Sequence, residues 1–137
     1  MAVPEGKRTE SKLSVQTKAI ELAEYTITIC SNEKNFPKRY RWCLTSKIVD
    51  AVTEIISDIN TANSIYVTTK GDYELRRSYQ TKALAYTARM LGLMQLAHTK
   101  FGINSKRIKH WTELVIDVRE LIKKWRKSDS NRYIKYK

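Results

Sequence analysis

Hydrophobic residues recur at helical spacing along most of the chain, most clearly near the C-terminus. There the spacing alternates between three and four residues through Ile108, Trp111, Val115, Val118, Ile122 and Trp125. Residues spaced in this way fall on one face of a helix. We therefore expect an amphipathic helix from about 105 to 128, with a buried apolar stripe and with Asn104 or Ser105 as its N-cap.

Three earlier segments show the same periodicity, at about 14–30, 37–63 and 73–99. Pro37 suits the first turn of the second segment, where a backbone N–H has no partner within the helix. Gly102 is the expected stop after the third. The apolar face of the second segment is wider than one neighbour would cover, so we expect it to pack against two helices or against another subunit.

Four amphipathic helices joined by short links indicate the all-α class, packed as an antiparallel up-down-up-down four-helix bundle. The chain of 137 residues is long enough for one domain with its own core. We expect a flexible basic lead-in at 1–12, the bundle at 13–128 and a flexible basic tail at 129–137. Gly92, inside the third helix, costs about 1 kcal/mol of helix propensity, which suggests that a neighbouring helix approaches closely there.

The chain is strongly basic, with a formal net charge of +12 and a predicted pI of about 9.8. Residues 101–137 contribute a net +7 of this charge, from eleven Lys and Arg against four Asp and Glu. A pI above about 9 is typical of nucleic-acid-binding domains. Anionic membranes and acidic proteins also attract such a surface, so charge alone does not choose among these partners.

The expected topology predicts where the cations gather. The start of the second helix, the end of the third and the start of the fourth should meet at one end of the bundle, while the lead-in, the start of the third and the end of the fourth meet at the other. Further cations lie along the third helix. The candidate nucleic-acid-binding residues are Lys38, Arg39, Arg41, Arg76, Arg77, Lys82, Arg89, Lys106, Arg107, Lys109, Lys123, Lys124, Arg126 and Lys127.

Aromatic residues alternate with cations in the segment 36–42, Phe-Pro-Lys-Arg-Tyr-Arg-Trp. This mixture suits stacking on bases and contact with phosphates, with burial of Tyr40 and Trp42 in a core or an interface as the alternative. Cations at 106–109 oppose the dipole of the helix that they begin, which favours a role outside the helix. Cations at 123–127 suit the dipole, so a simple solvated face is the alternative there.

No pattern in the sequence indicates catalysis. The two histidines, His98 and His110, have no carboxylate or cysteine at the spacing of a triad or a metal site. A Gly-rich phosphate loop and a Glu-x-x-His motif are also missing from the sequence. We therefore expect a protein that is not an enzyme, with no metal and no cofactor, and with Cys30 and Cys43 as packing thiols.

The sequence also favours a cytoplasmic location and no membrane partner. It contains no run of about 18 apolar residues, the length that a membrane-spanning helix needs. Its first residues lack the apolar core of a signal peptide.

Three motifs resemble a known family. They are the segment 36–41 opening a long helix, Ala62-Asn63-Ser64-Ile65 closing it, and His110-Trp111 through Trp125 in the last helix. They are similar to the four-helix-bundle proteins that include the accessory variability determinant (Avd) of diversity-generating retroelements and the proteins encoded in intervening sequences of ribosomal RNA genes. The resemblance covers about residues 14–128.

This resemblance implies a homopentameric, barrel-like assembly with a positively charged surface. Its Avd branch implies a non-catalytic accessory protein that binds a reverse transcriptase and its structured RNA during mutagenic retrohoming. RNA is then the expected ligand, with DNA or an RNA/DNA hybrid as alternatives. Carried over to this chain, Lys38, Arg39, Arg41 and the cations of the fourth helix are the candidates for such contacts.

Two other functions remain open. One is a structural or interaction bundle of the intervening-sequence type, and the other is an adaptor whose cations meet an acidic protein partner. The segment 62–64 lacks the acidic-glycine continuation of the intervening-sequence branch, which favours the Avd branch.

Overall fold

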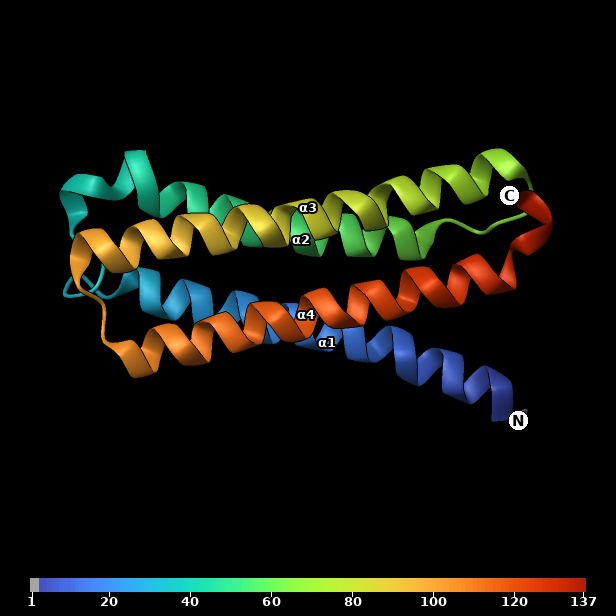
Figure 1. Ribbon diagram of the computed structural model, residues 1–137, viewed down its shortest axis with the longest axis horizontal. Helices are drawn as coiled ribbons and strands as arrows, with labels where there is room; N and C mark the ends of the chain where they lie inside the picture. The colour runs from blue at the N-terminus through green and yellow to red at the C-terminus, as the bar shows by residue number, and fades with distance from the viewer. Residues whose placement is uncertain (1–2) are drawn as a thin grey trace.

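The computed structural model describes the backbone of residues 3–137 and the side chains of residues 15–137. The described residues form helices and no strands, so the predicted all-α class is confirmed. Four long helices lie alongside one another as a bundle (Figure 1). They are α1 (Val3–Ser31), α2 (Ser46–Ser64), α3 (Lys70–Phe101) and α4 (Ser105–Arg132).

The core of the bundle lies along the apolar stripes that the sequence predicts. Each of α2 and α4 packs against both α1 and α3. The wide apolar face of α2 is thus covered by two helices of the same chain, the first of the two arrangements expected for it. On α4 the stripe is buried from Trp111 to Trp125, and the Trp111 Nε1–H donates a 2.9 Å hydrogen bond to Thr26 Oγ1 of α1.

The ends of α3 and α4 follow from local sequence. Asn104 caps α4 as predicted, because its side chain accepts hydrogen bonds of 2.9 and 3.4 Å from two backbone N–H groups of the first turn. Gly102, at φ 64°, ends α3 in the left-handed conformation that favours glycine. A capping box between Thr69 and Asp72 starts α3 at Lys70, three residues before the predicted start.

At one end of the bundle, aromatic side chains join three chain segments. Phe36 is buried between Phe101 and Trp111, with ring centroids 5.5 and 6.0 Å away, and Tyr40 packs on Phe101 at 5.1 Å. The connections at 32–37 and 102–104 therefore lie together (Figure 1). We call this end, built from residues 32–42 and 98–111, the first pole.

The second helical segment begins less regularly than the sequence suggests. A 3₁₀ turn, η1 (Lys38–Tyr40), and a π-helical turn, η2 (Arg41–Thr45), separate Pro37 from the regular helix α2. A π turn is wider than an α turn and often marks a functional site. The segment that mixes aromatic residues with cations is thus the irregular one.

At the opposite end, the C-terminal residues pack on the start of α3. Tyr133 lies 5.9 Å from Tyr73 between ring centroids, and the Tyr136 hydroxyl donates a 3.0 Å hydrogen bond to the Thr68 carbonyl. We call this end, built from residues 63–80 and 123–137, the second pole. Helix α4 therefore ends later than the predicted boundary at 128, because it continues to Arg132, and a further 3₁₀ turn, η3 (Ile134–Tyr136), follows it.

Two other expectations differ from the structure. Helix α1 begins at Val3 rather than near Ser14, and the side chains of the basic lead-in, 1–12, lie outside the described residues.

A Cβ atom added at Gly92 would meet no atom within 4 Å. Among the described residues, no neighbouring helix approaches closely there, so packing within the bundle does not explain the glycine.

Candidate functional site

The first pole brings together cations from two distant parts of the sequence. The six predicted residues here are all exposed: Lys38, Arg39, Arg41, Lys106, Arg107 and Lys109. One hydrogen bond joins the start of α4 to the connection before η1, because Arg107 Nη1 donates to Asn35 Oδ1 at 3.4 Å. The fold therefore builds one cationic surface from segments about seventy residues apart.

Aromatic rings organise part of this cationic surface. The Arg39 guanidinium and the Lys100 ammonium lie 5.4 and 5.6 Å from the centroid of the Tyr40 ring, within the range of a cation–π contact. The ring itself packs on Phe101. Tyr40 is thus partly buried scaffold that holds two cations in place, in line with the alternative considered for it.

Trp42 has a different environment. Its side chain is 80% exposed, although most large aromatic side chains bury much of their surface. It lies on η2 next to Arg41. Leu44, two residues later on the same π turn, is the first buried residue of this helical segment. Among the three tryptophans, Trp111 and Trp125 are buried in the core, so Trp42 alone offers its ring to a ligand.

An open cleft adjoins the same turn. Its volume is about 470 Å³. The apolar part of its lining includes Ile27, Phe36 and Val49. The charged part consists of Lys38, Arg41 and Glu33, which pairs with Lys38. A planar, partly apolar and negatively charged group suits such a lining.

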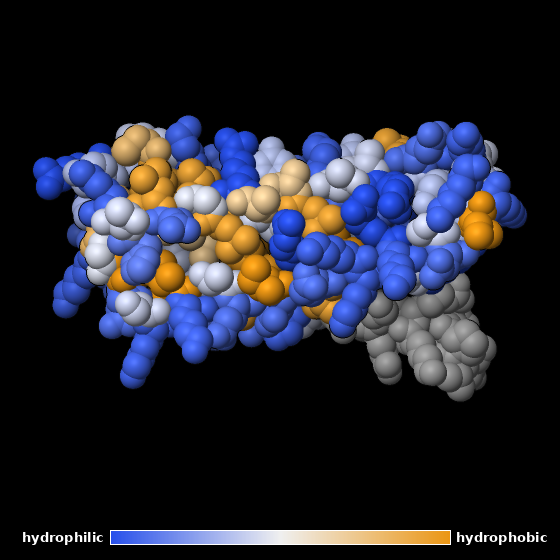
Figure 2. Space-filling view, in the orientation of Figure 1, coloured by the Kyte–Doolittle hydropathy of each residue, from blue (hydrophilic) through white to orange (hydrophobic). Residues whose placement is uncertain are grey.

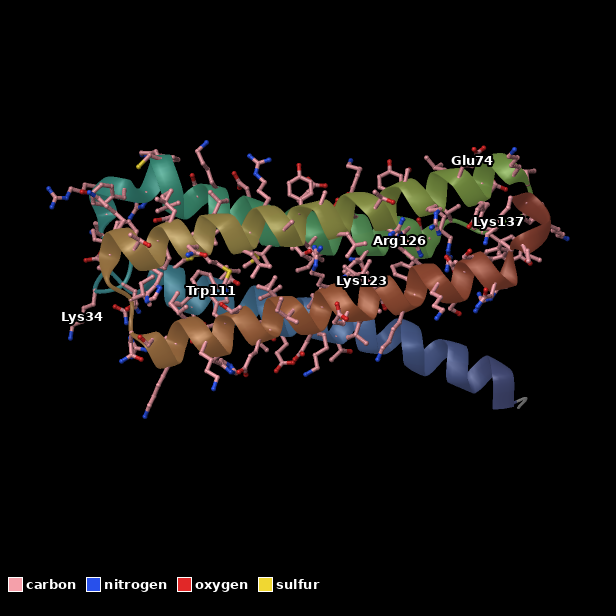
Figure 3. The ribbon with its side chains drawn as sticks, in the orientation of Figure 1. Lys34, Glu74, Trp111, Lys123, Arg126 and Lys137 are labelled. Carbon is pink, nitrogen blue, oxygen red and sulfur yellow. The ribbon has the colours of Figure 1, made fainter. Side chains whose placement is uncertain are left out.

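The second pole holds the other predicted cations, but they differ in exposure. Lys123, Lys124 and Lys127 are exposed, whereas Arg77 and Arg126 are half-buried. In Figure 3, the side chain of Arg126 lies between the ribbons of α3 and α4, and Lys123 lies earlier on α4, nearer the first pole. These five residues share one region of the bundle as predicted.

Arg76 does not belong to the candidate surface. Its side chain is 3% exposed and forms a bidentate pair with Asp129, from Nε to Oδ2 at 2.6 Å and from Nη2 to Oδ1 at 3.1 Å. Nη1 donates to the Ile65 carbonyl at 3.3 Å, and the guanidinium lies 5.3 Å from the Trp125 ring. With its donors in use inside the protein, Arg76 joins α3 to α4 and cannot contact a nucleic acid.

Two further residues of this buried network escaped sequence reasoning. Asp129 was assigned to a mobile tail, yet it is 2% exposed and also accepts a 2.9 Å hydrogen bond from Gln80 Nε2. Helical spacing offered the only signal: Asp129 follows Trp125 by four residues and so extends the buried stripe.

Two predicted cations lie along α3 between the poles. Lys82 and Arg89 are exposed and lie near Tyr79 and Tyr86, at 5.2 and 5.7 Å from the ring centroids. Lys82 also lies 3.9 Å from the carboxylate of Asp58 on α2. Lys82 therefore balances a buried charge in addition to facing solvent.

The environment of Asp58 is unfavourable for a charge. Burial and the nearby Glu54 carboxylate raise the pKa of Asp58 to about 6, although Lys82 acts in the opposite direction. One carboxylate oxygen is buried without a hydrogen-bond partner among the described residues. Such a carboxyl group titrates near neutral pH and couples the α2–α3 contact to pH.

Two other candidate cations are paired on the surface. Lys38 lies 3.2 Å from Glu33, and Lys123 lies 3.2 Å from Glu120. Exposed pairs of this kind contribute about 0–1 kcal/mol. Both lysines can therefore exchange their partner for a phosphate at small cost.

The two cysteines have opposite environments. Cys30 is buried, and desolvation raises the pKa of its thiol to about 12. Cys43 is exposed on η2, so the prediction that both are packing thiols is wrong for Cys43. Within the described residues, no group of three or more His, Cys, Asp or Glu side chains could hold a metal ion.

The face formed by α3 and α4 is divided along its length. Hydrophobic side chains gather over the half nearer the first pole, and the half nearer the second pole is mainly hydrophilic (Figure 2). These helices carry the partly buried Leu84, Leu91, Ile108 and Leu121 and the exposed Leu96. None of the helices in the described part of the chain has the length and apolar character to cross a membrane.

Comparison of the chain with protein-family models, curated proteins and solved structures found no match. The case for a function therefore depends on the geometry above and on the motifs in the sequence.

Proposed function

We propose that this protein is a non-catalytic accessory protein that binds nucleic acid, with structured RNA as its ligand. One observation carries the proposal: Trp42 exposes 80% of its side chain within a surface built from cations of η1, η2 and α4. The scaffold in this proposal is an antiparallel up-down-up-down bundle that presents one cationic surface at each pole.

Two physical effects support the assignment. Lys and Arg neutralise phosphates and release counterions, which supplies most of the sequence-independent affinity. An exposed aromatic ring stacks on an unpaired base, and this contact is worth about 1–3 kcal/mol per base. The first pole offers both within a few residues, at Arg39, Arg41 and Trp42.

The identity of the partners follows from the resemblance in the sequence. We propose association with a reverse transcriptase and its template RNA in the cytoplasm, and assembly into a homopentamer. A ring of five copies would repeat each cationic pole and raise affinity through multivalency. The apolar half of the α3–α4 face and the exposed Ile20 and Ile27 of α1 provide surface for contact between proteins.

Tryptophan fluorescence and RNA affinity test the proposal together. Because Trp111 and Trp125 are buried, quenching by a structured RNA with unpaired bases should come from Trp42. Trp42→Ala should abolish the quenching and weaken binding about tenfold, while Trp42→Phe should retain most of the affinity. Ile116→Ala is the control, because Ile116 is a large exposed side chain of α4 that lies outside both poles.

The proposal fails if the wild-type protein shows no salt-dependent affinity for RNA. The role of Trp42 is rejected if Trp42→Ala and Ile116→Ala bind RNA equally well.

The apolar half of the α3–α4 face favours a second candidate, an adaptor for an acidic protein partner. In that case the cations would steer the encounter and the apolar strip would be buried in the complex. Affinity purification with and without nuclease separates the candidates. A partner retained after nuclease treatment and lost on Leu96→Glu would support the adaptor.

A further inference from the structure

Arg77 on α3 and Arg126 on α4 form an unusual pair of like charges. Both side chains are half-buried, and each has a buried nitrogen, Nη1 of Arg77 and Nε of Arg126, without a hydrogen-bond partner in the structure. Neither belongs to any ion pair among the described residues. Buried guanidinium groups normally have an acceptor, so this arrangement lacks its expected counterpart.

The neighbouring residues bring these parts of α3 and α4 together: Arg76, next to Arg77, pairs with Asp129 and lies 5.3 Å from the ring of Trp125, next to Arg126. Burial, followed by the positive charge of Arg77, lowers the pKa of Arg126, and Tyr73 acts weakly in the opposite direction. The nearby carboxylate is already in use, because Asp129 pairs with Arg76 and Gln80. The protein thus supplies a counter-ion to the neighbouring Arg76 and none to Arg77 or Arg126 within the described residues.

We propose that Arg77 and Arg126 form an oxyanion site between α3 and α4, and that its ligand is a phosphate group of the nucleic-acid backbone. The nucleic-acid ligand rests on the proposed function, whereas the oxyanion site does not. Arg side chains bind phosphate through forked, charge-assisted hydrogen bonds, and two from facing helices can clamp one phosphate. Figure 3 shows Arg126 directed into the space between the two helices, where such a group would enter.

The site also has an electrostatic rationale. Without an anion, the two charges repel each other in a partly desolvated space, which destabilises the folded protein. A bound oxyanion removes the repulsion and pairs the orphaned nitrogens. The exposed Lys123, Lys124 and Lys127 on the same helix also attract an anion. Because water solvates their charges, they do not need an anion to relieve repulsion.

The first arm of the test uses inorganic phosphate and thermal unfolding. At matched ionic strength, phosphate should raise the Tm of the wild-type protein above its value in chloride. Arg77→Gln and Arg126→Gln should lose this increase, and in chloride their Tm should equal or exceed that of the wild type. Arg126→Lys should lose most of the increase in Tm, because lysine keeps the positive charge but lacks the forked donors of a guanidinium group. Lys124→Gln is the matched control and should keep it.

The second arm measures RNA affinity by fluorescence anisotropy, with folding checked by circular dichroism. Arg126→Gln should weaken RNA binding about tenfold, as expected for losing a charge-assisted hydrogen bond, and by more than Lys124→Gln does.

An equal increase of Tm by phosphate in the wild type and in Arg126→Gln would overturn the oxyanion site. A lower Tm of both glutamine variants in chloride would show that the arginines are structural, and would overturn it too. If the phosphate effect is specific but Arg126→Gln and Lys124→Gln bind RNA equally, the nucleic-acid ligand is rejected. A wild-type protein that responds to phosphate but does not bind RNA would reject the proposed function and leave the oxyanion site standing.

Discussion

Arg76 and Asp129, fifty-three residues apart in the sequence, form a buried bidentate ion pair that closes the second pole. The pair joins the first turns of α3 to the last turns of α4. Gln80 Nε2 donates a further hydrogen bond to Oδ2, the carboxylate oxygen that also accepts from Arg76 Nε. This ion pair therefore adds a buried polar contact to the packing of Tyr133 and Tyr136 that holds the C-terminal segment on α3.

Removing one partner should destabilise the protein strongly. Asp129→Ala leaves the Arg76 charge buried and uncompensated, which costs about 3–5 kcal/mol. Urea unfolding followed by circular dichroism measures this change, with the exposed Ser128→Ala as the control. A loss below about 1 kcal/mol, the usual size for a surface pair, would show that the pair is solvated rather than buried.

Asp58 should make stability depend on pH. Its folded pKa of about 6 lies above the ordinary value of 3.8, so folding favours the protonated form. This contribution is fully present below about pH 4 and is lost as the pH rises through about 6. Asp58→Asn should therefore be more stable than the wild type at pH 7, by on the order of 2 kcal/mol.

The advantage of Asp58→Asn should disappear near pH 4. Asp50→Asn, which alters an exposed carboxylate on the same helix, should show no comparable difference between the two pH values. Denaturant titrations at both values provide the measurement. A constant difference between Asp58→Asn and wild type across this range would contradict the assignment.

Gly92 offers a stabilising substitution. Because a Cβ at this position would meet no atom within 4 Å, Gly92→Ala should raise helix stability by about 1 kcal/mol. Gly102→Ala is the contrasting variant and should destabilise, since Gly102 has a positive φ of 64°. A destabilised Gly92→Ala in the oligomer, with a stabilised monomer, would instead place Gly92 in an intersubunit contact.

The two thiols should react at very different rates. Cys43 is exposed and should be alkylated in the native protein, whereas Cys30 is buried with its pKa raised to about 12. Mass spectrometry should find one modification in the native protein and two after denaturation. Rapid native labelling of Cys30 would show that the contact between α1 and its neighbours opens readily.

Charge reversal at the start of α4 should change the salt dependence of RNA binding. Changing Lys106, Arg107 and Lys109 to Glu removes up to three phosphate contacts, so the slope of log affinity against log salt should fall by about 2. Lys18→Glu and Lys47→Glu, exposed cations of α1 and α2, form the control. An unchanged slope in the triple variant would exclude the first pole from the phosphate contacts.

The helices could be predicted from the sequence because their stripes are local patterns. The stripe from Ile108 to Trp125 and the cap at Asn104 both involve residues within a few turns of each other. The cationic poles were also predictable in outline, because short connections leave few topologies. The exposure of Trp42 could not be predicted, because helical periodicity assumes a regular α-helix and does not anticipate the π turn that begins at Arg41.

The buried polar contacts could not be predicted for a different reason. Arg76 with Asp129, and Trp111 with Thr26, are pairs whose partners lie on separate helices. No local pattern specifies such a pair, because the contact depends on how two helices rotate about their axes. For the same reason, the sequence does not distinguish the buried Arg76 from a surface cation. Nor does it distinguish the half-buried Arg126 from the exposed lysines beside it.

The π turn from Arg41 to Thr45 has a consequence for how the first pole can change. Such a turn accommodates one residue more than an α turn, so deleting one residue from it would restore regular helix. The segment before the turn, which includes Arg39 and Tyr40, would then rotate by about 100° around the helix axis relative to α2. The buried stripe of α2 beyond the turn would keep its register, whereas the buried Phe36 and the contact between Tyr40 and Phe101 would have to repack. One codon would therefore redirect the cations of the first pole at the expense of the aromatic rings that support them.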